Sequence, residues 1–229
     1  MKLELLDAYN IRARLSASII LLAPIAVTLF FLFEEVHIFA TSSIILFVLL
    51  ALANYVPILQ RTFSKNRTSR TNYATQLLYV DNKTISAEMK KRYYAKISKL
   101  DPSFACFENP VDTPAFKCAC ESAVTYLRNR TRDNHLVQEE NINYGFCRNL
   151  YANKAAGIIV AALCSAFTIL FSCQKHGMLS AIPIQNYLAF GFDGLLLLFW
   201  IFLATKKALE QTGFSYAKAL IESIDSLQG

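Results

Sequence analysis

Charged residues are scarce in this sequence of 229 residues, where Lys, Arg, Asp and Glu make up 17% of the chain against 54% hydrophobic residues. An ordinary water-exposed surface needs more charge than this, so the composition excludes an average soluble domain. Catalytic motifs are lacking too, since the sequence holds no glycine-rich phosphate loop, nucleophile elbow or paired His and Glu motif. We therefore expect neither an enzyme nor a bound cofactor.

Cysteine is also sparse, and its spacing indicates no disulfide framework among the six residues. Cys118 and Cys120 are two residues apart on an expected helix, so they point to different faces. Cys106, Cys147 and His135 are single candidates at no known zinc spacing. The sequence predicts no metal site, and cysteines in a cytoplasmic segment are expected to stay reduced.

The hydrophobic residues are gathered in four long runs, at about 15–33, 38–59, 155–173 and 187–204. At about 1.5 Å per residue, a helix of each run crosses the roughly 30 Å of membrane hydrocarbon. This pattern predicts an all-α integral membrane protein with four transmembrane helices, a helical cytoplasmic insertion between helices 2 and 3, and an amphipathic C-terminal helix. The expected domains are 1–59, 60–154, 155–204 and 205–229.

The distribution of basic residues predicts the orientation of these spans. Lys and Arg number 3 in the first tail, 16 in residues 60–154 and 3 in the last tail, but only 0 and 1 in the two short links. Because basic loops stay on the cytoplasmic side, both termini and residues 60–154 are expected inside the cell.

Local signals predict helices within the insertion and after the last span. Ser86 caps one helix, which ends at Asp101 and Pro102, and Thr113 with Pro114 begins the next. A third helix, 143–154, is expected to continue into the third span. The expected buried positions are Met89, Tyr93, Ile97, Leu100, Phe116, Cys120, Ala123 and Leu127, with Phe214, Ala217, Leu220, Ile221 and Ile224 in the C-terminal helix, which packs under the insertion or mediates assembly.

The insertion carries 16 basic and 9 acidic residues, which indicates an anionic partner. Arg128 and Arg132 are four residues apart on an expected helix face, where their guanidinium groups suit successive phosphates. Tyrosines, including Tyr126, are suited to stack on bases. The candidate ligand-binding residues are Arg128, Arg130, Arg132, Tyr144, Arg148 and Tyr151. A solvated basic face beside anionic lipid headgroups is the alternative.

Asp193 lies inside the fourth hydrophobic run, between Gly191 and Gly194. An acid at that depth is costly and usually faces a bundle interior or water. In a symmetric oligomer, one Asp193 from each subunit forms a ring that favours cations in a pore. The alternative is an interfacial acid that caps a tilted helix or pairs with Lys175 or His176.

Two stretches, ATQLLYVDNKTISAEMKKRYYAKISKL and LRNRTRDNHLVQEENINYGFCRNLYANKAAGI, carry a resemblance that covers nearly the whole chain. They resemble bacterial four-span membrane proteins found beside nucleotidyltransferase genes, and the membrane effector of anti-phage systems of the Hailong type. The resemblance implies a homo-oligomeric ion channel in a bacterial inner membrane, gated by a nucleotide or short oligonucleotide made by a partner nucleotidyltransferase. From the residues alone, a non-conducting membrane anchor that recruits a cytoplasmic partner protein remains the alternative.

Overall fold

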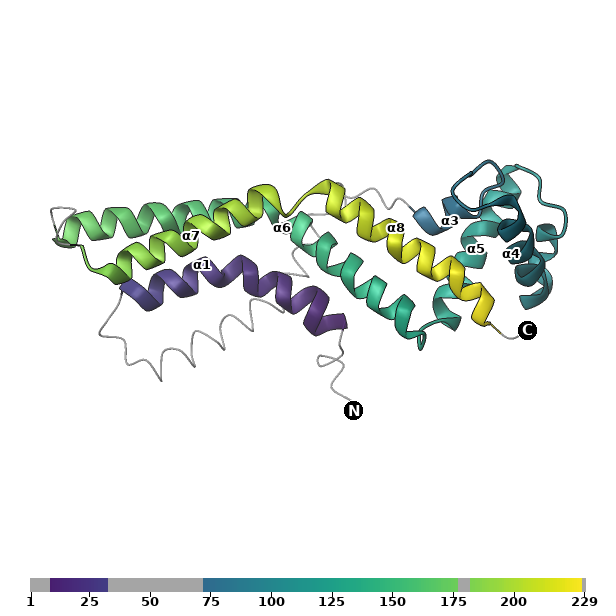
Figure 1. The fold of residues 1–229 in the computed structure, drawn as a ribbon, viewed down its shortest axis with the longest axis horizontal. Coiled ribbons are helices and arrows are strands. Elements are labelled where there is room, and N and C mark those ends of the chain that lie inside the picture. The colour runs from purple at the N-terminus through teal and green to yellow at the C-terminus, as the bar shows by residue number, and fades with distance from the viewer. Residues whose placement is uncertain (1–8, 33–71, 177–181, 228–229) are drawn as a thin grey trace. The chain divides into compact units, whose positions relative to one another are not determined.

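The structure is a computed structural model that describes residues 9–32, 72–176 and 182–227 (Figure 1). Every regular element in these ranges is a helix, which confirms the all-α prediction. The elements are η2 (Asn10–Leu15), α1 (Ser16–Leu32), α3 (Tyr73–Leu77), α4 (Ala87–Leu100), η4 (Pro102–Phe107), α5 (Pro114–Arg130), α6 (His135–His176), α7 (Ile184–Phe202), α8 (Lys206–Glu222) and η6 (Ser223–Ser226).

The described residues form two compact units. The first unit comprises residues 9–32, 145–176 and 182–209, and the second comprises 72–144 and 210–227. Helices α6 and α8 each contribute residues to both units. The helix expected over 143–154 does continue into the third hydrophobic run, because α6 is a single helix of 42 residues.

Three helices are long and apolar enough to cross a membrane: Asn10–Leu32, His135–Lys175 and Ile184–Phe202. They coincide with the first, third and fourth expected spans, while the second, 38–59, lies outside the described residues. Large apolar side chains point outward from these helices, including Phe30, Leu163, Leu170 and Leu195. Water would penalise such a surface, and exposed apolar side chains of this kind are typical of helices in a multi-pass membrane protein.

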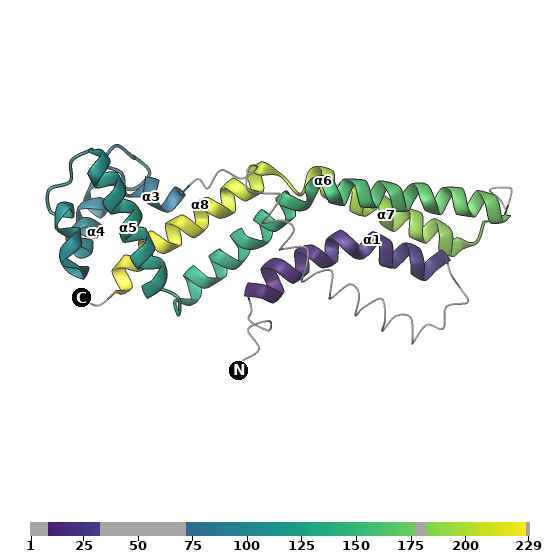
Figure 2. The ribbon, with the colours of Figure 1, turned by 180° about the vertical axis from the view of Figure 1, so that it is seen from behind.

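The first unit is built on close helix contacts. Helix α1 runs beside α7 in both views (Figures 1 and 2). The indole of Trp200, on α7, is fully buried and lies directly on Gly157 of α6. Lys154 Nζ donates to the carbonyl oxygen of Ile201 at 2.9 Å, near the C-terminus of α7. Since lipid supplies no hydrophobic force between helices, such small-residue contacts and hydrogen bonds hold the unit together.

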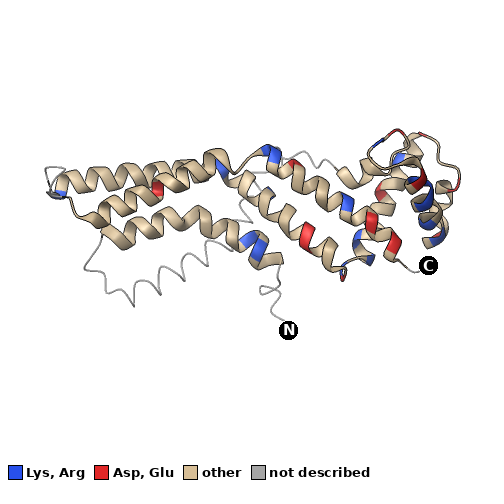
Figure 3. Cartoon of the chain, in the orientation of Figure 1, with Lys and Arg blue, Asp and Glu red and all other residues tan. Residues whose placement is uncertain are grey.

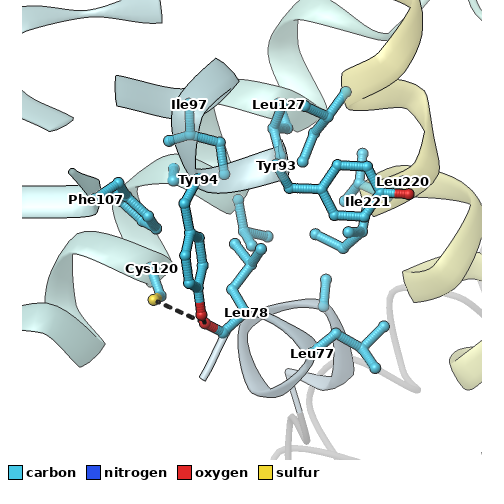
Figure 4. Packing of buried hydrophobic residues seen from close by; sticks show 14 of the residues in the cluster. Leu77, Leu78, Tyr93, Tyr94, Ile97, Phe107, Cys120, Leu127, Leu220 and Ile221 are labelled. Atoms are coloured by element: carbon cyan, nitrogen blue, oxygen red, sulfur yellow. Dashed lines mark hydrogen bonds between the residues drawn. The ribbon is translucent and has the colours of Figure 1, made fainter. Parts of the chain in front are cut away.

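The second unit has an aromatic core of the kind found in water-soluble domains (Figure 4). Ser86 and Thr113 cap α4 and α5 as expected, accepting hydrogen bonds from the amides of Met89 and Phe116. The expected apolar stripes of both helices enter the core, although Met89 and Leu100 are only partly buried. The rings of Tyr94, Phe104, Phe107, Phe116 and Tyr126 contact one another there.

The C-terminal helix α8 completes this core. Ala217, Leu220 and Ile221 of α8 and Ile224 of η6 are buried in the same cluster as α4 and α5, which confirms that the segment packs against the insertion. Phe214, expected on that face, is instead 38% exposed. Gly213 is buried one residue before it, where an added Cβ would lie 3.0 Å from the Tyr73 ring. The absence of a side chain therefore lets α8 approach α3 closely.

Candidate functional site

Charge is distributed very differently over the helices of the two units (Figure 3). Helix α1 carries no charged residue over Ser16–Leu32, and α7 carries Asp193 alone. Helices α4 and α5 hold most of the lysines and arginines of the second unit. The sequence therefore places two candidate sites on different elements, one basic and exposed, the other acidic and buried.

The arginines of the basic candidate lie at the end of α5. Arg128 donates to Asn72 Oδ1 at 3.2 Å, and Arg132 donates to Asn129 Oδ1 at 3.1 Å. Arg128, Arg130 and Arg132 are all exposed. Neutral amides hold two of the guanidinium groups, so an anionic ligand would meet no competing carboxylate in these contacts.

The prediction that Arg128 and Arg132 share a helix face is wrong. Helix α5 ends at Arg130, and its C-cap Thr131 leaves helical geometry with φ −103° and ψ 18°. Arg132 therefore lies in the following turn, where the i,i+4 relation of a helix no longer applies. Basic side chains in the last turn of a helix also favour its negative dipole end, which gives Arg128 and Arg130 a structural role.

The tyrosines of the basic candidate are already engaged. Tyr126 meets Phe104 edge-on, with 5.8 Å between the ring centroids. Tyr144 stacks on Tyr216 of α8, with the centroids 6.0 Å apart and the ring planes at 6°. One face of the Tyr144 ring is therefore covered, so a base would have to use its other face or replace Tyr216.

The candidate ligand residues divide between the two units. Arg128, Arg130, Arg132 and Tyr144 belong to the second unit, whereas Arg148 and Tyr151 follow on α6 within the first. Arg148 is exposed and Tyr151 is half-buried. Only the three arginines and Tyr144 are thus placed in one compact unit.

Asp193 is completely buried within the first unit. Thr28 Oγ1 of α1 donates to Asp193 Oδ2 at 2.9 Å, and this contact is buried as well. Cys164 of α6 interacts with Thr28 and lies close to Asp193, so residues of α1, α6 and α7 meet at this point. Lys175, the alternative partner expected from the sequence, lies instead over the ring of Phe171 at 5.9 Å.

A row of small and polar residues continues from this point along α6. Its spacing of three and four residues keeps the row on one helix face, which is buried or half-buried throughout. We call this row, together with Thr28 and Asp193, the polar seam. Its α6 members are Asn149, Asn153, Gly157, Ala161, Ser165, Thr168 and Ser172.

Both ends of the polar seam are hydrogen-bonded to neighbouring elements. Asn149 Nδ2 donates to the carbonyl oxygen of Ala13 at 2.7 Å. Near the other end, Asn186 Nδ2 of α7 donates to Ser172 Oγ at 2.8 Å, and Ser172 donates to the carbonyl of Thr168. These bonds connect α6 to η2 and α7 through side-chain amides, the residue types that join helices in lipid.

Between these ends, several polar atoms are buried without a partner. Over the described ranges they include Asn153 Nδ2, Ser165 Oγ, Thr168 Oγ1 and Asp193 Oδ1. An unsatisfied buried polar atom costs about 1–3 kcal/mol, so a chain seldom keeps several in one place without a use for them. The sequence pattern singles out Asp193, but the row on α6 was missed, although its regular small and polar spacing was the available signal.

No metal centre is formed by the described residues, where no three His, Cys, Asp or Glu side chains gather. Cys120 is buried and Cys118 is exposed, which confirms that the two thiols face different ways.

Comparison of the chain with protein-family models, with curated proteins and with solved structures finds no match in any of the three.

Proposed function

We propose that the chain is the pore-forming subunit of an oligomeric membrane effector that conducts ions when an anionic nucleotide signal binds its cytoplasmic insertion. In this proposal the segment 38–59 supplies a fourth span, and residues 60–154 and both termini lie in a bacterial cytoplasm. A role in anti-phage defence, with a nucleotidyltransferase as the source of the signal, follows from the resemblance described above. The lipid that surrounds the transmembrane helices would be that of the inner membrane.

The observation that carries the proposal is the burial of Asp193 with an unpartnered oxygen. A carboxylate inside a bundle of apolar helices is expensive to keep, and such residues mark ion or proton paths. The polar seam extends from Asp193 along α6 and offers hydroxyl and amide groups in place of water. A cation that moves along this row would be coordinated by the unpartnered oxygens of Ser165, Thr168 and Asp193.

In this proposal, a buried Asp193 corresponds to a state that does not conduct. Thr28 covers the carboxylate, and nothing in the first unit leaves it accessible. Ion passage therefore requires α1 and α7 to loosen at this contact. We assign the described bundle to the closed state, with the Thr28–Asp193 hydrogen bond as one of the interactions that keep it closed.

In this proposal the nucleotide signal binds to the insertion. Arg128, Arg130 and Arg132 present exposed guanidinium groups suited to phosphates. Helix α6 belongs to both units as one continuous element and carries most of the polar seam, so it offers a direct connection from insertion to membrane. A ligand gates such a protein only by its differential affinity for the closed and open states.

The test is ion flux through liposomes that contain the purified chain. Thr28→Val keeps the side-chain shape but removes a hydrogen bond worth about 1 kcal/mol, which predicts about fivefold higher basal flux. Asp193→Asn removes the charge and predicts weaker selection of cations over anions. Thr125→Val is the matched control, because Thr125 makes its local bond to the Glu121 carbonyl outside the membrane helices.

Equal flux and selectivity in wild-type, Thr28→Val and Asp193→Asn proteins would remove the polar seam from the pore. Double reversal of Arg128 and Arg132 to Glu is expected to abolish binding of short oligonucleotides in a titration.

The complete burial of Asp193 also favours a second candidate, a non-conducting anchor that recruits a cytoplasmic protein. That candidate predicts no flux from any variant under any ligand.

A further inference from the structure

A cavity of about 630 Å³ opens in the second unit, away from the arginines at the end of α5. This volume is within the range of about 300–1,000 Å³ typical of small-molecule sites. It is lined by one side of α4 and by the end of η4 with the residues that follow η4. The lining residues are Val80, Ala87, Lys90, Lys91, Tyr94, Ala95, Ser98, Lys99, Phe107, Glu108 and Pro110.

The lining has an apolar floor. Tyr94 and Phe107 are almost fully buried, and their ring centroids are 5.6 Å apart. The Tyr94 hydroxyl donates to the carbonyl of Leu78 at 2.6 Å, which fixes the ring against the core. Because these two rings offer little accessible surface, a ligand would contact mainly the apolar residues Val80, Ala95 and Pro110 of the walls. A ligand with an apolar or aromatic body is therefore favoured over a bare inorganic ion.

Lys90 is the one lysine of the lining that is already committed to the fold. Its ammonium donates to the carbonyls of Tyr79, at 2.6 Å, and of Asn82. Burial lowers the pKa of this amine, as expected for an ammonium taken out of water. Lys90 therefore closes the turn before α4 and has little capacity left for a ligand.

Lys91 and Lys99 differ from Lys90 in this respect. Both are exposed, and within the described part of the chain neither forms an ion pair or hydrogen bond. They are two helical turns apart, about 12 Å along the axis, with Ala95 and Ser98 between them. Long lysine side chains from both turns can reach one anion held over Ala95. Glu108, also exposed, is another residue of the lining and offers an acceptor to a ligand N–H or O–H.

We propose that this cavity binds a small phosphate ester whose organic body lies against Val80, Ala95 and Pro110, above the buried rings of Tyr94 and Phe107, and whose phosphate is held by Lys91 and Lys99. Nothing above assigns these residues a role. The site is separate from Arg128, Arg130 and Arg132, and the proposal requires neither conductance nor gating. A nucleotide and a simple aryl phosphate share the required chemistry, so the test separates them.

The experiment is calorimetric titration of the full chain in lipid nanodiscs with phenyl phosphate, adenosine monophosphate and inorganic phosphate. Phenyl phosphate is expected to bind at least about tenfold more tightly than inorganic phosphate, because only the ester uses the apolar floor. Tighter binding of adenosine monophosphate than of phenyl phosphate would identify the ligand class as a nucleotide. Equal binding of the two esters would assign the site to phosphate esters in general.

Variants test the position of the site. Lys91→Gln with Lys99→Gln is expected to weaken ester binding at least about tenfold, through loss of two charge-assisted contacts. Lys83→Gln with Lys207→Gln makes the same change in net charge outside the lining and should leave binding within about twofold of wild type. Ala95→Phe keeps both ammonium groups but fills the space between them, and should also weaken binding.

Three results would overturn the proposal: no ester binding at millimolar concentration, equal affinity for inorganic phosphate and both esters, or affinity unchanged in the double lysine variant and in Ala95→Phe. Failure of the pore proposal is distinguished from failure of the cavity proposal, because the titration measures ligand binding and does not depend on ion flux. Loss of flux in Asp193→Asn with intact ester binding would leave the cavity proposal in place.

Discussion

The two units of this chain place their polar and apolar residues in opposite ways. The second unit buries rings and aliphatic side chains and exposes most of its lysines and arginines. The first exposes leucine and phenylalanine and buries Asp193, Thr28, Thr168 and Asn153. One unit is arranged for water and the other for lipid, and polar groups in lipid are tolerated where they join helices or serve a function.

Alkaline pH should give the largest difference in stability between the two units. In the second unit, a buried hydroxyl and a buried thiol donate hydrogen bonds in the core only while they are protonated (Figure 4). The Tyr94 hydroxyl and the Cys120 thiol both donate to the Leu78 carbonyl, at 2.6 and 3.8 Å. Burial raises the pKa of Tyr94 to about 12, and burial also raises the pKa of Cys120 to about 12.

Folded-state pKa values above the unfolded ones predict stability that is complete below about pH 9 and lost as the pH rises to about 12. Each pKa unit of difference is worth about 1.4 kcal/mol, so ionisation of the two groups together lowers the free energy of unfolding by several kcal/mol. The second unit should therefore unfold at alkaline pH, which phenolate absorbance and circular dichroism will report. The single Trp, Trp200, lies in the first unit, so its fluorescence should stay unchanged there.

The double variant Tyr94→Phe with Cys120→Ala is the control for this prediction. It should be less stable than wild type at pH 8, since it loses two buried groups, but its stability should fall less between pH 9 and 12. An equally steep alkaline loss in the double variant would show that other groups cause the transition.

Gly157→Ala should give the next largest effect, now in the first unit. A Cβ at position 157 would clash with the Trp200 indole, which is fully buried. Overpacking of this kind costs typically about 1–3 kcal/mol, and the close approach places this site at the upper end. We expect a lower unfolding midpoint in detergent together with a shifted Trp200 emission.

Gly194→Ala provides the matched control on α7. Within the described residues, an added Cβ at position 194 meets nothing within 4 Å. This variant should keep or slightly raise the unfolding midpoint of the wild type, because Ala has a higher helix propensity than Gly. An equal loss of stability in both glycine variants would show that the Trp200 contact does not cause it.

The sequence was most informative where a single helix decides the outcome. Caps at Ser86 and Thr113 and the apolar stripe of α5 are set by neighbours within about four residues, so local rules suffice. Hydrophobic length likewise predicted the three helices that are long and apolar enough to cross a membrane. Each of these elements depends on residues close together in the chain, and that is why the amino-acid sequence alone predicts them.

Contacts between distant segments were not predictable in this way. Thr28 and Asp193 are 165 residues apart, and no local signal pairs them. The end of α5 at Arg130 was also missed, because Arg128 and Arg132 suit a continued helix in spacing alone. Nothing in the sequence indicated that Lys90 would be used by carbonyls while Lys91 and Lys99 stayed unpaired. Which lysine of a cluster is available for a ligand depends on the tertiary fold.

Asp225→Asn should give the smallest effect and set the scale for an acid in water. Asp225 pairs with Arg92 and with Lys96, the latter at 2.9 Å, and all three side chains are more than a third exposed. Such pairs contribute about 1 kcal/mol or less, and salt screens them over about 3 Å at 1 M. We expect a small loss of unfolding free energy in low salt that disappears in 1 M NaCl. A loss above about 2 kcal/mol that persists in high salt would mean that this surface acid behaves like one buried in the protein interior.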